Sequence, residues 1–383
     1  MKKERLFAPG PTPVPDDVAL AMAAPIVHHR SPAFAPTIAA VAEGLKWLFQ
    51  SEEPVITFAA SGTGAMEAAV ANFTARGDTV IVVRGGKFGE RWGEISAVYG
   101  LEVVPIDVEW GTAVTPDRVA EALRAHPEAR AVMVQASETS TGAAHPVRAL
   151  AELTARRPET LLFVDAISAM GCMELKTHEW GLDVVVAGSQ KGFMLPPGLA
   201  FLTGSAKAWA AVERSDHARY FLDAQKERKA LLKGSTAYTP AVSLWVGLAK
   251  ALARMREEGL EALFARHAIL ARATREAMRA LGLELFAGAA PSPALTSVAA
   301  PEGIDGQEIY NRLRNDYGVT IAGGQAELKG KIFRIAHLGW ADRLDLIQAI
   351  AALEMVLADL GHPVELGKGV ATAQAILREG ARA

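Results

Sequence analysis

The feature that most constrains the fold is an alternation, between Val55 and Ser205, of short apolar runs with longer amphipathic segments. The runs are VITFAA (55–60), TVIVVR (79–84), LEVVPID (101–107), AVMVQA (131–136), LLFVDAI (161–167), DVVVAGS (183–189) and LAFLTGS (199–205). Most are continuously apolar, which is typical of strands that helices cover on both faces. The pattern predicts an α/β domain with a mostly parallel, seven-stranded sheet. Ligands of such sheets bind outside the carboxyl ends of the strands, so the residues after each run are the candidates for a site.

The rest of the chain predicts a second, smaller unit. Residues 241–281 keep apolar positions at a spacing of three to four, which predicts helix with a break at Gly259. Beyond it, the strand candidates LELFAG, TSVAAPE, VTIAGG and KIFRIAHLG are separated by helices around GQEIYNRLRNDYG and RLDLIQAIAALEMVLADL. Because a domain holds roughly 100–200 residues, the 383 residues suggest two domains, the second of them α+β.

Charge and cysteine content narrow the class of partner. The formal net charge is −3 with both signs interspersed, so we expect neither a nucleic-acid face nor a polybasic membrane patch. No apolar run approaches the ~20 residues of a membrane helix, and the start MKKERLFAPGPTPVP has no apolar stretch after its lysines. We therefore expect a soluble, cytoplasmic protein with a small-molecule partner. One cysteine, Cys172, excludes an internal disulfide, and His28, His29 and His145 are too scattered to form a metal site.

The first run ends in a glycine-rich turn, Ser61–Gly64, that feeds the helical segment AMEAAVANFTA. Free N–H groups at a helix N-terminus favour a phosphate, although these four residues alone fit an ordinary turn equally well. The turn also nearly matches the dinucleotide motif GxGxxG, but Glu67 replaces the third glycine and the next run ends in Arg84 without an acidic residue for a ribose. The sequence thus argues against a nicotinamide cofactor and leaves an NADP-type site only as a weak alternative.

Two more run ends carry chemistry. Asp165 lies near the end of the fifth run inside an apolar segment, and Lys191 follows the sixth run, 26 residues after Asp165. Alone, the aspartate is typical of a turn cap and the lysine of a surface side chain. A lysine in apolar surroundings, however, has a lowered pKa and forms Schiff bases with aldehydes. A phosphate cradle, a carboxylate and a reactive amine together are the groups that pyridoxal phosphate (PLP) needs.

The order SGTGAMEAAVAN, VDAISAMG, AGSQKG resembles the class V aminotransferases among the fold-type-I PLP enzymes, most closely the alanine/serine–glyoxylate aminotransferase branch. The segments FAPGPTPVP, HHRSPAF and KGKIFRIAHLG extend the resemblance over nearly the whole chain. It implies a large PLP-binding domain at 18–256, a small domain at 257–383, and an arm at 1–17 that joins the small domain or a dimer interface.

The resemblance also implies roles for single residues. Lys191 would form the Schiff base and Asp165 would pair with the pyridine nitrogen, while Arg334 would bind the α-carboxylate of the substrate. Gly10 would shape the substrate entrance. The other implied cofactor contacts are Ser61, Gly62, Thr63 and Gln190 at the phosphate, Phe88 stacked on the ring, Thr139 beside the phenolic oxygen, and Tyr238 and Thr239 donated by the partner subunit of a homodimer.

The implied activity is a ping-pong transamination from a small amino acid, alanine or serine, to a small 2-oxo acid, glyoxylate or pyruvate. Aspartate and aminophosphonate donors stay open, because nothing in the sequence sizes the pocket. A cysteine desulfurase of the same fold is disfavoured, since Phe88 stands at the ring position and Cys172 is the only thiol. A non-catalytic relative is disfavoured because a scaffold has no need for a paired Lys191 and Asp165.

Overall fold

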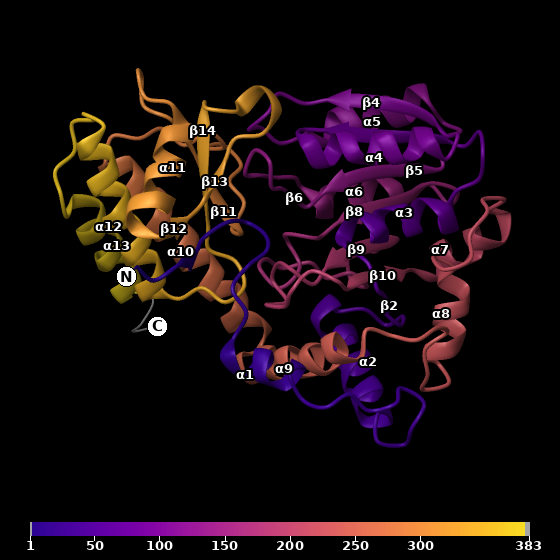
Figure 1. Ribbon diagram of the computed structural model, residues 1–383. Coiled ribbons are helices and arrows are strands. Elements are labelled where there is room, and N and C mark those ends of the chain that lie inside the picture. The colour runs from indigo at the N-terminus through magenta and orange to yellow at the C-terminus, as the bar shows by residue number, and fades with distance from the viewer. Residues whose placement is uncertain (1, 380–383) are drawn as a thin grey trace.

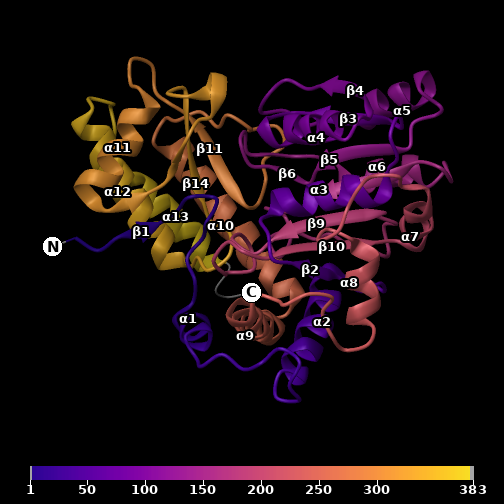
Figure 2. The same ribbon diagram turned by 45° about the vertical axis from the view of Figure 1, so that its right-hand side comes forward.

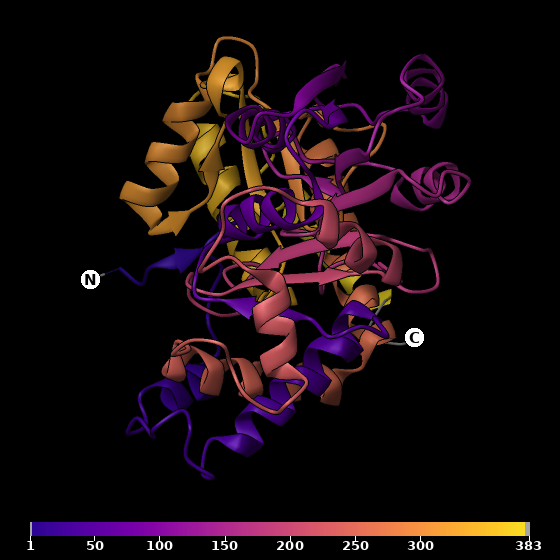
Figure 3. The same ribbon diagram turned by 90° about the vertical axis from the view of Figure 1, so that its right-hand side faces the viewer.

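The computed structural model describes residues 2–379. Figure 1 shows a large region built on a sheet and, beside it, a smaller region formed by the C-terminal part of the chain in orange and yellow. In the view turned by 90°, the smaller region lies behind the larger one (Figure 3). The molecule therefore has the two-part architecture that the sequence predicts.

The main sheet of the large region has seven strands in the order β2-β10-β9-β8-β5-β3-β4. Its strands are β2 (Ile56–Phe58), β3 (Thr79–Arg84), β4 (Glu102–Asp107), β5 (Ala131–Gln135), β8 (Leu161–Asp165), β9 (Val184–Gly188) and β10 (Ala200–Gly204). Only β10 runs antiparallel to its neighbours, so the other six strands point the same way. All seven predicted runs are strands of this sheet, and the predicted fold class is confirmed.

Helices cover both faces of the sheet, which explains why the strands are continuously apolar. Along β3, Val80 and Val82 belong to the core on one face, whereas Ile81 and Val83 belong to the core on the other. The first face packs against α3 (Gly62–Phe73), α4 (Lys87–Val98), α7 (Ala206–Ala211) and α8 (Ala224–Leu231). The second packs against α2 (Ala35–Phe49), α5 (Pro116–Ala125), α6 (Val147–Thr154) and α9 (Val242–Glu258).

The C-terminal region pairs a three-stranded sheet with helices. Its strands lie in the order β11 (Leu295–Ala299), β14 (Ile332–Ala336), β13 (Ala322–Gly323). Its helices are α10 (Leu260–Ala280), α11 (Gly306–Tyr317), α12 (Arg343–Asp359) and α13 (Lys368–Glu379). The predicted helix break falls at Gly259, whose φ of 83° suits glycine.

One predicted strand of this region is wrong. The segment LELFAG is not a strand, because Leu285 forms only an isolated bridge with Val298. Apolar residues alone do not make a strand where no neighbouring backbone continues the ladder. Helix α13, which the sequence reasoning did not anticipate, packs against α10 and α12.

The N-terminal segment connects the two regions. Strand β1 (Arg5–Leu6) pairs in parallel with β12 (Val319–Thr320), beside the helices of the C-terminal region (Figure 2). Phe7 joins the apolar core of that region. Five residues later, the Thr12 N–H donates to the carbonyl oxygen of Gln190 at 3.1 Å, so the segment reaches from the small region to the edge of the large sheet.

Within residues 2–379, no helix has both the length and the apolar character needed to cross a membrane. Helix α1 (Asp16–Met22) completes the N-terminal segment and packs against α9.

Candidate active site

Three predicted site segments lie at one edge of the large sheet. Asp165 is the last residue of β8, and Lys191 follows β9 by three residues. The two strands are parallel neighbours, so their carboxyl ends lie side by side. The turn at Gly62 lies there too, because a methyl group placed on Gly188 would come within 3.2 Å of the Gly62 nitrogen. The topology therefore brings the amine, the carboxylate and the glycine turn together, as the sequence predicts.

Lys191 is buried, with 8% of its surface exposed. Its amine donates a hydrogen bond to the carbonyl oxygen of Pro9. Burial lowers the pKa of Lys191 to about 8, although the charge of Asp165 opposes this shift. Since the neutral amine is the nucleophilic form, this environment prepares Lys191 to react with a carbonyl group near neutral pH.

Asp165 is buried as well, and its Oδ1 accepts a hydrogen bond of 2.8 Å from the Ile167 N–H. Burial raises the pKa of Asp165 to about 7; the Ile167 N–H and the charge of Lys191 lower it, while the charge of Glu138 raises it further. A buried carboxylate with so raised a pKa lacks a full positive partner. The protonated ring nitrogen of PLP has the charge that this carboxylate needs, so Asp165 fits that group.

The glycine turn has the features of a phosphate cradle. Ser61 is the N-cap of the 12-residue helix α3, and its side chain makes no capping hydrogen bond. At Gly62 a Cβ would lie 2.5 Å from Cδ1 of Ile167, so the packing of the turn against Ile167 favours glycine there. Gln190 has a buried Oε1 without a partner among the described residues, but a phosphate would be bound by the NH₂ of this amide and not by its oxygen. The free N–H groups at the N-terminus of α3 fit a bound phosphate.

Arg91 belongs to this cluster, and sequence reasoning missed it. Its Nη1 donates to Thr63 Oγ1 at 3.3 Å, and its Cζ lies 4.9 Å from the centre of the Phe88 ring. Arg91 therefore connects the cradle to the predicted stacking residue. Its position three residues after Phe88, on the same face of α4, was the available signal.

Thr139 and Arg334 meet at the other end of the site. Thr139 Oγ1 lies 2.6 Å from the Oγ of Ser168, which follows the Asp165 strand. Arg334 Nη1 donates to the Thr139 carbonyl at 2.6 Å, and its Nε and Nη2 both donate to the Gly323 carbonyl. These three bonds use three of the five guanidinium N–H groups and leave one on each terminal nitrogen. Burial lowers the pKa of Arg334 to about 10, where the group is still charged at neutral pH.

Gly10 lies directly against Lys191. A methyl group on its Cα would come within 2.4 Å of Lys191 Nζ. Its φ of 148° also lies in the range that side chains disfavour. Thr12 anchors the same segment, because its Oγ1 donates to the Lys191 carbonyl at 2.9 Å.

Tyr238 and Thr239 are not brought to this cluster. They lie between α8 and α9, and α8 lies on the side of the large region away from β11, β13 and β14 (Figure 1). The Tyr238 hydroxyl donates to the Tyr220 carbonyl at 2.9 Å, and Thr239 is exposed. Among residues 2–379, no hydrogen bond joins either residue to Lys191 or Asp165. Their role in the site of a partner subunit stays a prediction.

Among the described residues, the three histidines and Cys172 form no hydrogen bond with Lys191 or Asp165. His145 is buried, with its Nδ1 accepting a hydrogen bond from the Val114 N–H, while His28 and His29 pack against each other. Burial raises the pKa of the Cys172 thiol to about 12, so it stays protonated at neutral pH. The described part of the chain holds no group of three or more potential metal ligands.

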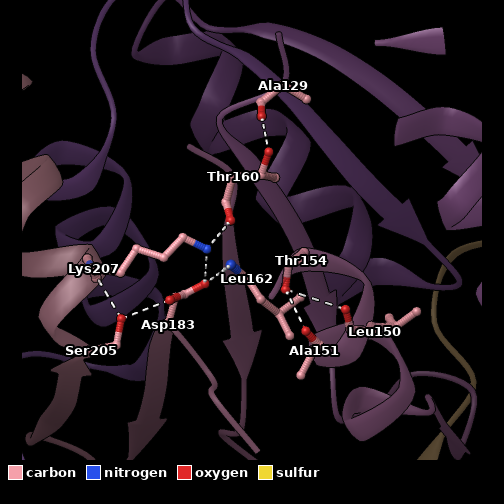
Figure 4. A network of polar contacts seen from close by, with 10 residues as sticks. Ala129, Leu150, Ala151, Thr154, Thr160, Leu162, Asp183, Ser205 and Lys207 are labelled. Carbon is pink, nitrogen blue, oxygen red and sulfur yellow. Dashed lines mark hydrogen bonds and ion pairs between the residues drawn. The ribbon is translucent and has the colours of Figure 1, made fainter. Parts of the chain in front are cut away.

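A second polar network lies at the opposite edge of the sheet (Figure 4). There the buried carboxylate of Asp183 accepts hydrogen bonds from the Leu162 N–H at 2.9 Å, the Ser205 hydroxyl at 2.8 Å and the Lys207 amine at 3.1 Å. Lys207 also donates to the Thr160 carbonyl. Asp183 immediately precedes β9 and Lys191 follows it, so the two clusters are separated by the length of this strand. The hydrogen bonds of Asp183 connect β8, β9 and the start of α7 to one another.

Comparison with known proteins agrees with the geometry. The sequence matches the class V aminotransferase family over residues 6–335. It is 41% identical to the serine–glyoxylate aminotransferase of Methylorubrum extorquens, over 98% of this chain and 96% of that protein. It is also 45% identical to a protein named soluble hydrogenase, small subunit, from Synechococcus, over 98% of both chains. The crystal structure of ureidoglycine–glyoxylate aminotransferase from Bacillus subtilis superimposes with a TM-score of 0.94 at 28% identity, covering 99% of each chain.

The chain therefore belongs to the class V aminotransferases and is a PLP-dependent transaminase. The family resemblance, the fold type and the enzyme class predicted from the sequence are all confirmed.

Proposed function

We propose that the enzyme transfers the amino group of a small amino acid, alanine or serine, to a small 2-oxo acid, glyoxylate or pyruvate. The observation that carries the proposal is the pair formed by Lys191 and Asp165. Both are buried at neighbouring strand ends, the amine with a lowered pKa and the carboxylate with a raised one. Perturbed pKa values of opposite direction at one site are typical of catalytic acid–base pairs.

The residues of the sheet edge would hold PLP as follows. The N–H groups at Gly62 and Thr63, with Ser61 and Gln190, would bind its phosphate, and Asp165 would pair with its ring nitrogen. Phe88 would lie against the ring. When bound, PLP supplies an electron sink for the negative charge that develops on the substrate carbon.

Arg334 would position the substrate. Its two remaining N–H groups, one on each terminal nitrogen, can bind both oxygens of an α-carboxylate. The bonds to Gly323 and Thr139 fix the plane of the guanidinium, so the carboxylate is held in one orientation.

Lys191 would move the proton. Its neutral amine would act as the base that takes the proton from the substrate Cα, and the resulting ammonium group would then hold that proton for the second half of the transfer. The pKa near 8 suits both directions, because an efficient acid–base group titrates close to the working pH. The segment Pro9–Thr12 covers the amine and would limit the access of water.

Glyoxylate is the favoured acceptor because two similar proteins, one by sequence and one by structure, carry it in their names. The donor is proposed more broadly as a small amino acid. Desulfurase chemistry is disfavoured by the buried, protonated Cys172. A hydrogenase role, which the name of the Synechococcus relative suggests, is disfavoured because one cysteine cannot supply the thiolate ligands of a metal cluster within this chain.

The first test is an absorbance spectrum of the purified enzyme before and after borohydride, followed by peptide mapping. We expect a yellow protein whose colour is bleached and whose pyridoxyl group maps to Lys191. The donor is then identified by adding alanine, serine or aspartate singly and following the loss of the yellow form, and the acceptor by its recovery with glyoxylate or pyruvate. An adduct on another lysine, or a spectrum that none of these amino acids changes, would contradict the proposal.

A further inference from the structure

Glu138 is a fully buried carboxylate that sequence reasoning did not single out. It ends the short strand β6 (Ser137–Glu138), whose hairpin partner is β7 (Ala143–Ala144). Its Oε2 accepts hydrogen bonds from the N–H groups of Phe88 at 3.1 Å and Gly89 at 3.0 Å. Its Oε1 accepts from the Ser140 N–H at 3.1 Å and from the Ser140 hydroxyl at 2.6 Å. Since all four partners donate, the side chain acts purely as an acceptor, which is the pattern of an ionised carboxylate.

These bonds fasten two turns to each other. One turn begins α4 and carries Phe88, and the other follows β6 and carries Thr139. Ser140 reinforces the connection, because its Oγ also accepts a hydrogen bond of 2.9 Å from the Lys87 N–H. The turns approach so closely that a methyl group on Gly86 would lie 2.5 Å from the Glu138 carboxyl carbon. The contact is therefore tight and specific.

The turn that follows Glu138 also contacts groups at both ends of the site. Thr139 Oγ1 bonds to Ser168, beside the Asp165 strand, and the Thr139 carbonyl accepts from Arg334. A shift of this turn would therefore displace Phe88, Ser168 and Arg334 together.

We infer that Glu138 is a positioning residue, which fixes the Phe88 turn and the Thr139 turn in one geometry and so sets both the affinity for PLP and the orientation of Arg334. The inference rests on the function proposed above.

The charge of Glu138 acts in the same place. Burial raises the pKa of Glu138, while its four hydrogen bonds lower it and favour the ionised form. Its negative charge raises the pKa of Asp165 and opposes the lowering of the pKa of Arg334. Glu138 thus influences the two charged groups that would bind the ring nitrogen and the substrate carboxylate.

Glu138→Gln is the sharpest variant, because it keeps the shape and replaces one acceptor oxygen with a donor NH₂. That NH₂ must face either the Phe88 and Gly89 N–H groups or the Ser140 N–H, so at least one buried donor loses its partner. We expect the dissociation constant for PLP, measured by titrating PLP into the cofactor-free full-length enzyme, to rise by about tenfold or more. The KM for the amino donor should rise as well.

Asp183→Asn is the matched control. Asp183 is also a buried carboxylate with backbone, hydroxyl and amine donors, but it lies at the opposite edge of the sheet (Figure 4). A general loss of stability would lower the unfolding temperature of both variants. Only the positioning role predicts that Glu138→Gln changes the PLP affinity and KM while Asp183→Asn leaves both within about twofold.

The outcomes separate this inference from the proposed function. If the wild type binds no PLP, the proposed function and this inference both fail. If the wild type binds PLP and Glu138→Gln binds it within twofold of the wild type, only the inference is overturned. If Glu138→Gln does not fold, Ser140→Ala tests the inference instead. This substitution removes the hydroxyl that donates to Glu138 and accepts from the Lys87 N–H. A several-fold weaker PLP affinity in that variant supports the inference, and an unchanged one overturns it.

Discussion

The Lys191 amine donates a hydrogen bond to the carbonyl oxygen of Pro9, a residue 182 positions earlier in the chain. Thr12 holds the same segment through the carbonyls of Gln190 and Lys191. At its other end the segment is bound to the C-terminal region, since Phe7 donates to Thr320 and accepts from Ala336. The N-terminal segment therefore ties the reactive lysine to the region that carries Arg334.

Gly10→Ala tests this contact. The added methyl group would lie within 2.4 Å of Lys191 Nζ, so the amine or the segment must move. We expect kcat/KM to fall by about tenfold or more, because misplacement of a reacting group by about 1 Å is costly. Gly303→Ala is the control, since Gly303 also has a positive φ, of 78°, but a methyl group there meets no atom within 4 Å. Equal losses of activity in the two variants would show that backbone strain, and not contact with Lys191, is responsible.

The pH dependence of cofactor attachment tests the lowered pKa of Lys191. Only the neutral amine attacks an aldehyde, and the pKa of about 8 means that its fraction rises steeply up to that pH and levels off above it. We expect the rate of PLP attachment to the cofactor-free enzyme to rise by about tenfold per pH unit below 8 and to become flat near pH 9. Lys191→Arg should form no borohydride-reducible adduct at any pH. A rate that still climbed in the same way up to pH 10.5 would mean that the amine titrates like a free lysine.

Much of the fold was predictable from the sequence, because its strands are apolar on both faces and their ends carry polar residues. Parallel strands bring those ends to one edge, so Asp165 and Lys191 could be placed together without a structure. The prediction for LELFAG failed because its pairing with β11 does not extend beyond a single bridge, which local composition does not reveal.

The supporting residues of the site could not be predicted in this way. Glu138 stands in the polar segment ASETSTG, where nothing local indicates burial. Its hydrogen-bond partners Phe88 and Gly89 lie about 50 residues earlier in the sequence, and only the folding of the chain brings them to Glu138. The contact between Pro9 and Lys191 likewise depends on how the N-terminal segment crosses between the regions.

Asp165→Asn should change the stability of the cofactor-free enzyme in a pH-dependent way. The pKa of Asp165 is about 7 in the fold and 3.8 in the unfolded chain, so the folded state binds the extra proton between these values. The resulting stability is present below pH 4 and is lost as the pH rises through 7. Since one pKa unit corresponds to about 1.4 kcal/mol, we expect Asp165→Asn to be more stable than the wild type by roughly 2–4 kcal/mol at pH 8.

Urea unfolding of the cofactor-free proteins at pH 4.5 and pH 8 measures this difference. Asparagine keeps an oxygen that can accept from the Ile167 N–H, so the advantage of the variant should fall to about a quarter of its pH 8 value at pH 4.5. Asp183→Asn should instead destabilise the enzyme at pH 8, because Lys207 loses its charged partner. An advantage of Asp165→Asn that was the same at both pH values would contradict the assigned pKa.

Arg334→Lys should separate substrate binding from chemistry. Lysine keeps the positive charge but has a single nitrogen, so it cannot bond to Gly323 and Thr139 while also gripping both carboxylate oxygens. We expect the KM for the amino donor to rise by about tenfold to a hundredfold, with a smaller change in kcat, as the loss of a bidentate pair predicts. Arg275→Lys is the control, because Arg275 is also partly buried in the C-terminal region but, among residues 2–379, makes only a long bond of 3.5 Å to the Ser292 carbonyl. Steady-state kinetics with the donor identified from the spectrum would measure both variants, and an unchanged KM in Arg334→Lys would assign the substrate carboxylate to another group.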